Sequence, residues 1–257
     1  MSGKAFITGA ASGIGRATAR LFAARGWRVG LADRDAAGLA TLAAELGGAT
    51  SEVFCCDVSD PTALEAALVA FCGGADGSLD LLVNNAGVLR IGPFEQTSPA
   101  DHRQLIDINA RGVVEALLAA FPMLRRARGR VVNLASASAS YGSPDYATYS
   151  ATKMFVRGLS EALDIEWRRH GIRVACIMPA FVATPMIAGR RSGAMDRLGV
   201  QLQPEDVAAV IWRAAHGHRL MWYVGWRYRL VRGLSALLPG AVNRVMMRWI
   251  SGYPAGG

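Results

Sequence analysis

Short apolar runs alternate with longer amphipathic stretches along most of the chain. Short apolar runs are typical of buried strands, and apolar residues spaced three or four apart are typical of helices that cover a sheet. The apolar runs predict strands at 5–8, 28–32, 52–56, 79–83, 130–134, 173–178 and 221–225. The stretches between them predict helices at about 13–25, through residue 46, from residue 61, at 101–127 and at 150–169.

Strands that alternate with helices of this length are joined by right-handed crossovers and form a parallel sheet. We therefore expect an α/β fold with a single doubly wound, Rossmann-type parallel sheet of about seven strands and helices on both faces. No repeat, low-complexity segment or linker divides residues 1–225, which we assign to one domain.

The pattern changes after residue 225. Apolar residues recur at helical spacing from Leu230 to Trp249, and Pro239 divides two predicted helices. We assign 226–257 to a C-terminal helical extension. We expect it to pack on its own domain or on a second subunit. Two alternatives remain open, in which it covers the active site or lies on an anionic membrane through its Arg and Trp residues.

Composition narrows the classes of protein. The chain has 257 residues, of which 52% are hydrophobic and 19% charged, so it can bury a core without disulfides or metals. The net charge is +8, but the arginines are spread along the whole chain, and no series of aromatic and basic residues suited to nucleic-acid binding accompanies them. No nucleic-acid partner is therefore expected. Cys55 and Cys56 lie at the third strand, where buried inert thiols are expected. The four cysteines show no disulfide spacing, and the longest uncharged stretch, 174–189, is broken by two prolines. A cytoplasmic location is therefore expected.

A glycine-rich turn, Thr8-Gly-Ala-Ala-Ser-Gly-Ile-Gly15, separates the first strand from the first helix. Glycines let the backbone approach a pyrophosphate, and the helix that follows presents free N–H groups to the phosphates. Asp33 ends the second strand, where a carboxylate accepts hydrogen bonds from a ribose and repels a 2′-phosphate. NAD(H) is therefore favoured, and Arg34 keeps NADP(H) open as an alternative.

Tyr149 and Lys153 are four residues apart at the start of a predicted helix, so both side chains lie on one face. A tyrosine hydroxyl normally titrates near ~10. A lysine ammonium close by would lower that pKa and make the phenol a usable base. Ser136 follows the strand at 130–134, where its hydroxyl would reach the same pocket.

Together these motifs resemble the short-chain dehydrogenase/reductase family, over roughly residues 3–225. The family's pattern is also matched, in order, by Asp57-Val58, by Asn84-Asn85-Ala86-Gly87 and by Asn109. One departure is Ala180, which stands after Pro179 where the family usually has glycine. The resemblance implies a catalytic domain that binds a dinucleotide, in a homodimer or homotetramer.

The resemblance implies four catalytic residues. Tyr149 would be the general base in oxidation and the acid in reduction. Lys153 would hold the nicotinamide ribose, Ser136 would bind the substrate oxygen, and Asn109 would connect Lys153 to a proton relay. The residues implied to contact the cofactor are Gly9, Ser12, Gly13, Ile14, Gly15, Asp33, Arg34, Asp57, Val58, Asn85, Ala86, Gly87, Tyr149, Lys153, Pro179, Val182 and Thr184.

The family places a substrate loop after Thr184, here at about 185–203. The residues expected to contact the substrate are Ser136, Ser138, Tyr146, Phe181 and Met186. Phe181, Met186, Ile187 and Met195, with Tyr141 and Tyr146 across the cleft, favour an apolar pocket for a hydrophobic alcohol or ketone. Three loop arginines would either bind an acidic group or form a solvated edge: Arg190, Arg191 and Arg197. His216 and His218 lack a third ligand at metal spacing, so no metal site is expected.

These observations favour an oxidoreductase that transfers a hydride between NAD(H) and a secondary alcohol/ketone pair. An NADPH-dependent carbonyl or 3-oxoacyl reductase is the alternative within enzymes, and Asp33 argues against it. A dinucleotide-binding sensor without catalysis is the alternative from another class. The Tyr149 and Lys153 pair argues against a sensor, because pure binding needs no such pair.

Overall fold

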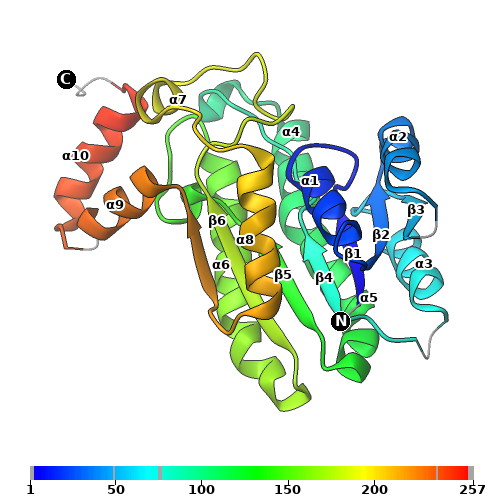
Figure 1. Cartoon of the computed structure of the whole chain (residues 1–257). Coiled ribbons are helices and arrows are strands. Elements are labelled where there is room, and N and C mark those ends of the chain that lie inside the picture. Colours follow the sequence, from blue (N-terminus) through cyan, green and yellow to red (C-terminus); the bar gives the residue numbers. More distant parts are fainter. Residues whose placement is uncertain (1–2, 49, 75–76, 236, 254–257) are drawn as a thin grey trace.

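A parallel β-sheet forms the centre of the molecule (Figure 1). The computed structural model describes residues 3–48, 50–74, 77–235 and 237–253, and these contain seven strands in the order β3-β2-β1-β4-β5-β6-β7. The strands are β1 (Lys4–Thr8), β2 (Arg28–Asp33), β3 (Ser51–Cys55), β4 (Leu81–Asn84), β5 (Arg130–Leu134), β6 (Arg173–Pro179) and β7 (Met221–Val224). The predicted fold class is confirmed, and each predicted strand overlaps an observed one.

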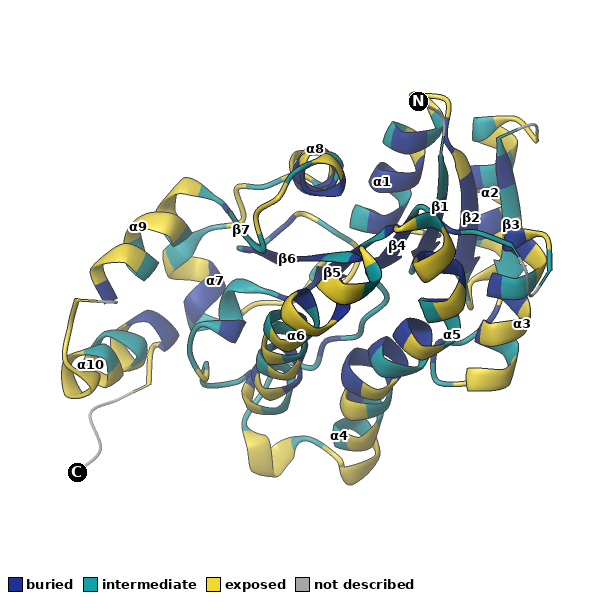
Figure 2. Ribbon diagram, turned by 90° about the horizontal axis from the view of Figure 1, so that it is seen from below, coloured by how far each residue is buried: buried dark blue, intermediate teal, exposed yellow. Residues whose placement is uncertain are grey.

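Helices cover both faces of the sheet (Figure 2). The helices between β1 and β7 are α1 (Gly13–Ala23), α2 (Ala36–Leu46), α3 (Pro61–Cys72), α4 (Pro99–Ile106), α5 (Gly112–Ala127), α6 (Ala147–Glu166), α7 (Gly193–Leu198) and α8 (Pro204–His216). Leu39 of α2 and Ile211 of α8 pack with Phe22 of α1 in the core on one face. Phe71 of α3 and Val156 of α6 belong to the core on the other face. Because both faces are covered, the central strands are almost continuously apolar.

The predicted helix at 101–127 lies within a continuous helical stretch from residue 99 to residue 127, but the stretch is not α-helical throughout. Helix α4 ends at Ile106, a π-helical turn covers Asp107–Arg111, and α5 begins at Gly112. The turn coincides with Asn109, which is fully buried and exchanges hydrogen bonds with the backbone of Val88. A π-helical turn inserts one extra residue into an α-helix and often marks a functional site. The helical spacing of the apolar residues gave no sign of this insertion.

Two further helices follow β7: α9 (Trp226–Ser235) and α10 (Gly240–Ser251). They are the two helices predicted on either side of Pro239. Tyr228 of α9 shares a hydrogen bond of 2.6 Å with Ser140, and Tyr253, just after α10, donates one of 2.7 Å to Asp145. Helix α10 also packs against α7 in the loop at 185–203. The pair therefore lies over the carboxyl end of β6 and β7 instead of continuing the sheet (Figure 1).

Candidate active site

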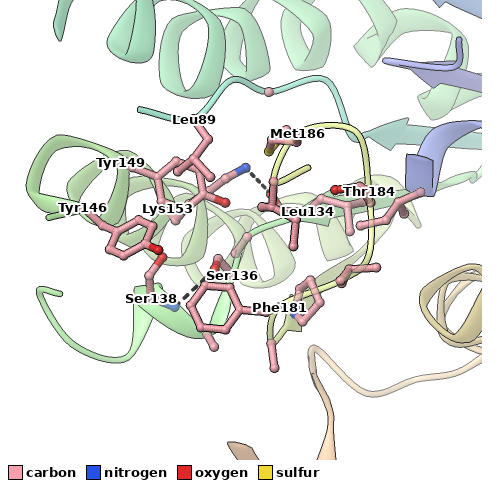
Figure 3. A pocket seen from close by; sticks show the side chains of 18 of the residues that line it. Leu89, Leu134, Ser136, Ser138, Tyr146, Tyr149, Lys153, Phe181, Thr184 and Met186 are labelled. Atoms are coloured by element: carbon pink, nitrogen blue, oxygen red, sulfur yellow. Dashed lines mark hydrogen bonds between the residues drawn. The ribbon is translucent and has the colours of Figure 1, made fainter. Parts of the chain in front are cut away.

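A cavity of about 530 Å³ opens at the carboxyl edge of the sheet. It begins where the strand order reverses, between β1 and β4, which is the usual ligand site of a doubly wound fold. All but two of the predicted site residues line it, and the exceptions are Gly15 and Asn109. Figure 3 labels ten of the lining side chains, including Ser136, Tyr149 and Lys153 around one region of the cavity.

The glycine turn forms one end of this cavity. Gly9 has a φ of +68°, and a Cβ on Gly15 would lie 2.0 Å from the carbonyl oxygen of Gly9. Gly15 is therefore needed for the close packing of the turn on α1, behind the cavity wall. Asn85 fixes the turn to the end of β4, because its Nδ2 donates to the carbonyl oxygens of Thr8 and Gly9 at 2.9 and 3.0 Å.

Helix α1 begins directly at the cavity. Its N-cap residue, Ser12, makes no side-chain capping hydrogen bond. The first N–H groups of a helix have no partner within the helix, so those of α1 remain available to an anion. The turn and α1 therefore fit the diphosphate of a dinucleotide.

Two carboxylates lie beyond the turn. Asp33 accepts hydrogen bonds from the backbone N–H groups of Ala11 and Asp35, at 3.0 and 3.1 Å. Burial acts to raise the pKa of Asp57, but hydrogen bonds from Ser59 and the charges of Arg34 and Arg111 outweigh it and lower that pKa. Both carboxylates line the cavity, as does Arg34. The two side-chain oxygens of Asp33 are acceptors that fit the hydroxyls of an adenosine ribose.

Ser136 lies just after β5, and Tyr149 and Lys153 lie on the first turns of α6. The Nζ of Lys153 donates a 2.8 Å hydrogen bond to the carbonyl oxygen of Leu134 (Figure 3) and lies 5.8 Å from the centre of the Tyr149 ring. Strand β5 and helix α6 thus bring the three side chains to the same wall of the cavity.

The expected lowering of the Tyr149 pKa is not observed. Withdrawal of the phenol from solvent raises its pKa to about 12, although the hydroxyl of Ser136 acts in the opposite direction. Burial also lowers the pKa of Lys153 to about 8. The sequence places the two side chains together but does not show how strongly their shared site is desolvated.

The buried Lys153 gives a pH-dependent prediction for stability. Its pKa falls from an ordinary 10.5 to about 8, so the unfolded chain holds more protons between these values and stability rises with pH there. The fall corresponds to roughly 3 kcal/mol. Allowing about 1 kcal/mol for the lost bond to Leu134, Lys153→Met should stabilise the protein by about 2 kcal/mol at neutral pH.

Urea unfolding of the Lys153→Met protein and of the wild type, at pH 7 and again near pH ~10, measures this difference. The gain should disappear at the higher pH, because Lys153 is then largely neutral in the folded protein and the cost of burying its charge is nearly gone. A variant that is less stable than the wild type at pH 7 would contradict the assigned cost of burying the charge.

Asn109 lies behind this wall and is fully buried. Its Oδ1 accepts from the N–H of Val88 at 2.8 Å, and its Nδ2 donates to the carbonyl oxygen of Val88 at 2.9 Å. The same Nδ2 lies 3.3 Å from the hydroxyl of Thr152, one residue before Lys153. The side chain of Asn109 thus ties the π-helical turn to the segment after β4 and to α6.

The other end of the cavity is largely apolar. Phe181 faces Tyr146 with ring centres 6.3 Å apart, and the hydroxyl of Tyr146 lies 2.6 Å from that of Ser192 in the loop. Ser138 contributes a buried hydroxyl for which the described residues offer no hydrogen-bond partner. An apolar chamber with a few placed hydroxyls is typical of a small-molecule site.

Sequence reasoning missed part of this chamber. The additional apolar side chains that line it include Leu89, Leu134, Leu198, Val231, Met247 and Ile250. Three of them come from α9 and α10, so these helices do cover the cavity, which was an alternative in the sequence analysis. The apolar spacing after residue 225 was the available signal.

The three loop arginines do not line the cavity. Arg190 donates to the carbonyl oxygen of Leu89 at 2.7 Å, Arg191 forms a 3.3 Å ion pair with Asp196, and Arg197 stacks on Trp249. Cys55, expected to be buried, is exposed, because the side chain of this residue in the edge strand β3 faces outward. Within the described residues no cluster of His, Cys, Asp and Glu is suited to a metal ion.

Comparison with known proteins agrees with this geometry. The family model for short chain dehydrogenases matches residues 4–194. The D-threitol dehydrogenase of Mycolicibacterium smegmatis is 37% identical over 80% of this chain and 82% of its own. The galactitol 2-dehydrogenase (L-tagatose-forming) of Cereibacter sphaeroides is 40% identical over 80% and 84%. The crystal structure of a 3-ketoacyl-(acyl-carrier-protein) reductase from Brucella melitensis, complexed with NADH, superposes with a TM-score of 0.80 at 29% identity, over 86% and 96% of the chains.

Proposed function

Because the chain belongs to the short-chain dehydrogenase family, we propose that it is an oxidoreductase that interconverts a secondary alcohol and a ketone with NAD(H). One observation carries the proposal. Ser136, Tyr149 and Lys153 line the same cavity as a glycine turn and a carboxylate suited to a dinucleotide. A protein that only binds a dinucleotide has no need for Ser136, Tyr149 and Lys153 together.

The cofactor is proposed to lie along the carboxyl edge of the sheet. The glycine turn and α1 would hold its diphosphate, Asp33 its adenosine ribose, and Asp57 and Val58 the adenine. Lys153 would bind the second ribose, and the nicotinamide supplies the hydride acceptor or donor when bound. The remaining proposed contacts are Arg34, Asn85, Ala86, Gly87, Pro179, Val182 and Thr184.

The protein's own chemistry is then proton management. The hydroxyl of Ser136 orients the substrate oxygen, and the phenol of Tyr149 donates a proton to it in reduction. In oxidation Tyr149 must first be a phenolate, which takes the proton from the alcohol and becomes the phenol, and a charged Lys153 favours that ionised form. Asn109 would fix the π-helical turn against α6 and so keep the path from Lys153 to solvent in place.

NAD(H) is proposed over NADP(H) because Asp33 lines the cavity at the end of β2, where an acidic side chain binds the ribose hydroxyls and disfavours a 2′-phosphate. The NADH complex of the Brucella melitensis reductase supports this choice. An NADPH-dependent 3-oxoacyl reductase remains the second candidate, because Arg34 also lines the cavity and would pair with a phosphate.

The substrate is proposed to be hydrophobic. The chamber beyond Ser136 and Tyr149 is lined by Leu89, Phe181 and Met186, while Ser138 and Tyr146 supply its hydroxyls. The related D-threitol and galactitol dehydrogenases are named for polyols, so the two classes of alcohol need to be compared directly.

We also propose a domain organisation, an oligomeric state and a cellular location for this oxidoreductase. Residues 1–225 would form the catalytic domain and 226–257 an extension that covers the substrate chamber. A homodimer or homotetramer would use the exposed apolar side chains of α5 and α6, among them Leu118 and Phe155. A cytoplasmic location agrees with four cysteines that form no disulfides.

Absorbance of reduced nicotinamide tests the proposal. The protein is mixed with NAD⁺ or NADP⁺ and a panel of threitol, galactitol and apolar secondary alcohols. Turnover with NAD⁺, faster on apolar alcohols than on polyols, is the expected result. Turnover with NADP⁺ alone would favour the reductase. Cofactor binding without turnover of these alcohols, or of the matching ketones with NADH or NADPH, would favour the sensor.

A further inference from the structure

Helices α9 and α10 have two different faces. The inner face lines the cavity through Tyr228, Val231, Met247 and Ile250. The outer face is exposed and strongly apolar, and Figure 2 shows both helices largely exposed at one end of the molecule. Its large side chains are Leu230, Leu234, Leu237, Leu238, Val242, Val245 and Trp249, and Trp226 at the start of α9 is exposed but also borders the cavity.

The outer side chains follow helical spacing. Trp226, Leu230 and Leu234 are four residues apart on α9, and Val242, Val245 and Trp249 are three and four apart on α10. Leu237 is 85% exposed and lies between the two helices. On each helix the apolar side chains therefore form a band rather than scattered exposures, and such bands mark interaction surfaces.

The same segment carries only positive charge. From Val207 to Gly257 the sequence contains no Asp or Glu. Within α9 and α10 the arginines are Arg227, Arg229, Arg232, Arg244 and Arg248, and all but Arg232 are exposed. By helical periodicity Arg227 and Arg229 flank the apolar band of α9, while Arg244 and Arg248 lie beside that of α10.

We propose that this surface docks onto an anionic lipid bilayer, with α9 and α10 lying in the plane of the interface. An apolar band flanked by arginines matches the layered chemistry of a bilayer surface, where acyl chains lie beneath negative headgroups. Trp226 and Trp249 are residues that concentrate at this depth. Among the described residues no helix is long and apolar enough to cross a membrane.

A second copy of the chain fits this surface less well. A symmetric contact would bring the same arginines from both copies together with no carboxylate from the segment between them. Like charges that face each other across an interface are costly. An anionic bilayer supplies the opposite charge.

Docking would also place the substrate chamber beside the lipid. The inner and outer faces belong to the same two helices, so only their thickness separates the apolar chamber from the bilayer. An apolar alcohol dissolved in the membrane would then enter locally. The docking itself does not depend on the proposed function, because its test measures binding and not turnover.

Vesicle flotation of the full chain tests the proposal. The vesicles contain phosphatidylcholine alone or with one third phosphatidylglycerol, at low and high salt. The wild type should float only with the anionic vesicles and less at high salt. Arg229→Gln/Arg244→Gln should weaken binding at least tenfold, since each arginine near the surface contributes about fivefold. Leu234→Glu/Val245→Glu should abolish it.

Ile165→Glu/Arg169→Gln is the matched control. It combines one apolar-to-Glu and one Arg-to-Gln change, so its net charge falls by two as in the test variants, and both positions are exposed on α6 and the turn that follows it. This variant should float like the wild type. None of the substituted residues lines the cavity, so all variants should keep the melting temperature and cofactor binding of the wild type.

Two results would overturn the proposal. One is a wild type that does not float with either kind of vesicle. If light scattering then shows that Leu234→Glu/Val245→Glu turns a dimer into a monomer, the surface is a contact between copies. The other is equal flotation of the wild type and both α9/α10 variants, which would place the lipid contact elsewhere on the molecule.

Discussion

Replacing Tyr149 with Phe is expected to reduce kcat/KM by about three orders of magnitude in both directions. General acid–base catalysis by a positioned side chain contributes about 10²–10⁴-fold, and Phe removes only the hydroxyl that exchanges the proton. The ring of Tyr149 packs in the apolar cluster with Tyr146 and Ile250, so the fold and the cofactor affinity should be unchanged. Initial rates, the melting temperature and a cofactor titration by fluorescence measure the three quantities.

Tyr146→Phe is the matched control. Its hydroxyl bonds to Ser192 in the loop, so its loss should weaken substrate binding rather than stop the chemistry. The pH dependence gives a second check, since the pKa of Tyr149 lies at about 12 in this structure. Oxidation, which needs the ionised phenol, should therefore rise with pH through the alkaline range. A Tyr149→Phe protein with a tenth or more of wild-type activity would remove Tyr149 from the proposed mechanism.

The sheet was predictable because its signals are local. Strands such as β5 are short, apolar and bounded by polar residues, and each is followed by a helix of crossover length. The relative positions of Tyr149 and Lys153 were predictable for the same reason, since two residues that are four apart on a helix lie on the same face. Topology then brings the ends of β1, β4 and β5 to one edge of the sheet.

Other features depend on contacts that are distant in sequence. The π-helical turn at Asn109 involves hydrogen bonds to Val88, and the raised pKa of Tyr149 follows from burial by several elements. Neither feature is marked by a pattern in the neighbouring sequence. The C-terminal helices are an intermediate case, because their apolar spacing predicted two helices. That spacing did not show that α9 and α10 would line the cavity with one face and expose the other.

Replacing Asp33 with Asn is expected to lower the preference for NAD⁺ over NADP⁺ by ten- to a hundredfold, measured as the ratio of the two kcat/KM values. Hydrogen bonds to a charged group are worth about 1.5–3 kcal/mol, and tenfold corresponds to about 1.4 kcal/mol. Asn keeps the shape of the side chain but removes the charge that repels a 2′-phosphate. The value of kcat/KM should therefore fall with NAD⁺ and rise with NADP⁺.

Asp33 also holds the backbone, since its two oxygens accept from Ala11 and Asp35. Asn has one acceptor oxygen, so Asp33→Asn loses one of these bonds, and the melting temperature must be measured beside the kinetics. Arg34→Ala separates the two effects, because it leaves Asp33 in place and should reduce use of NADP⁺ only. An unchanged ratio in Asp33→Asn with a lowered melting temperature would mean that Asp33 supports the turn without selecting the cofactor. The choice between NAD(H) and NADP(H) would then depend on Arg34.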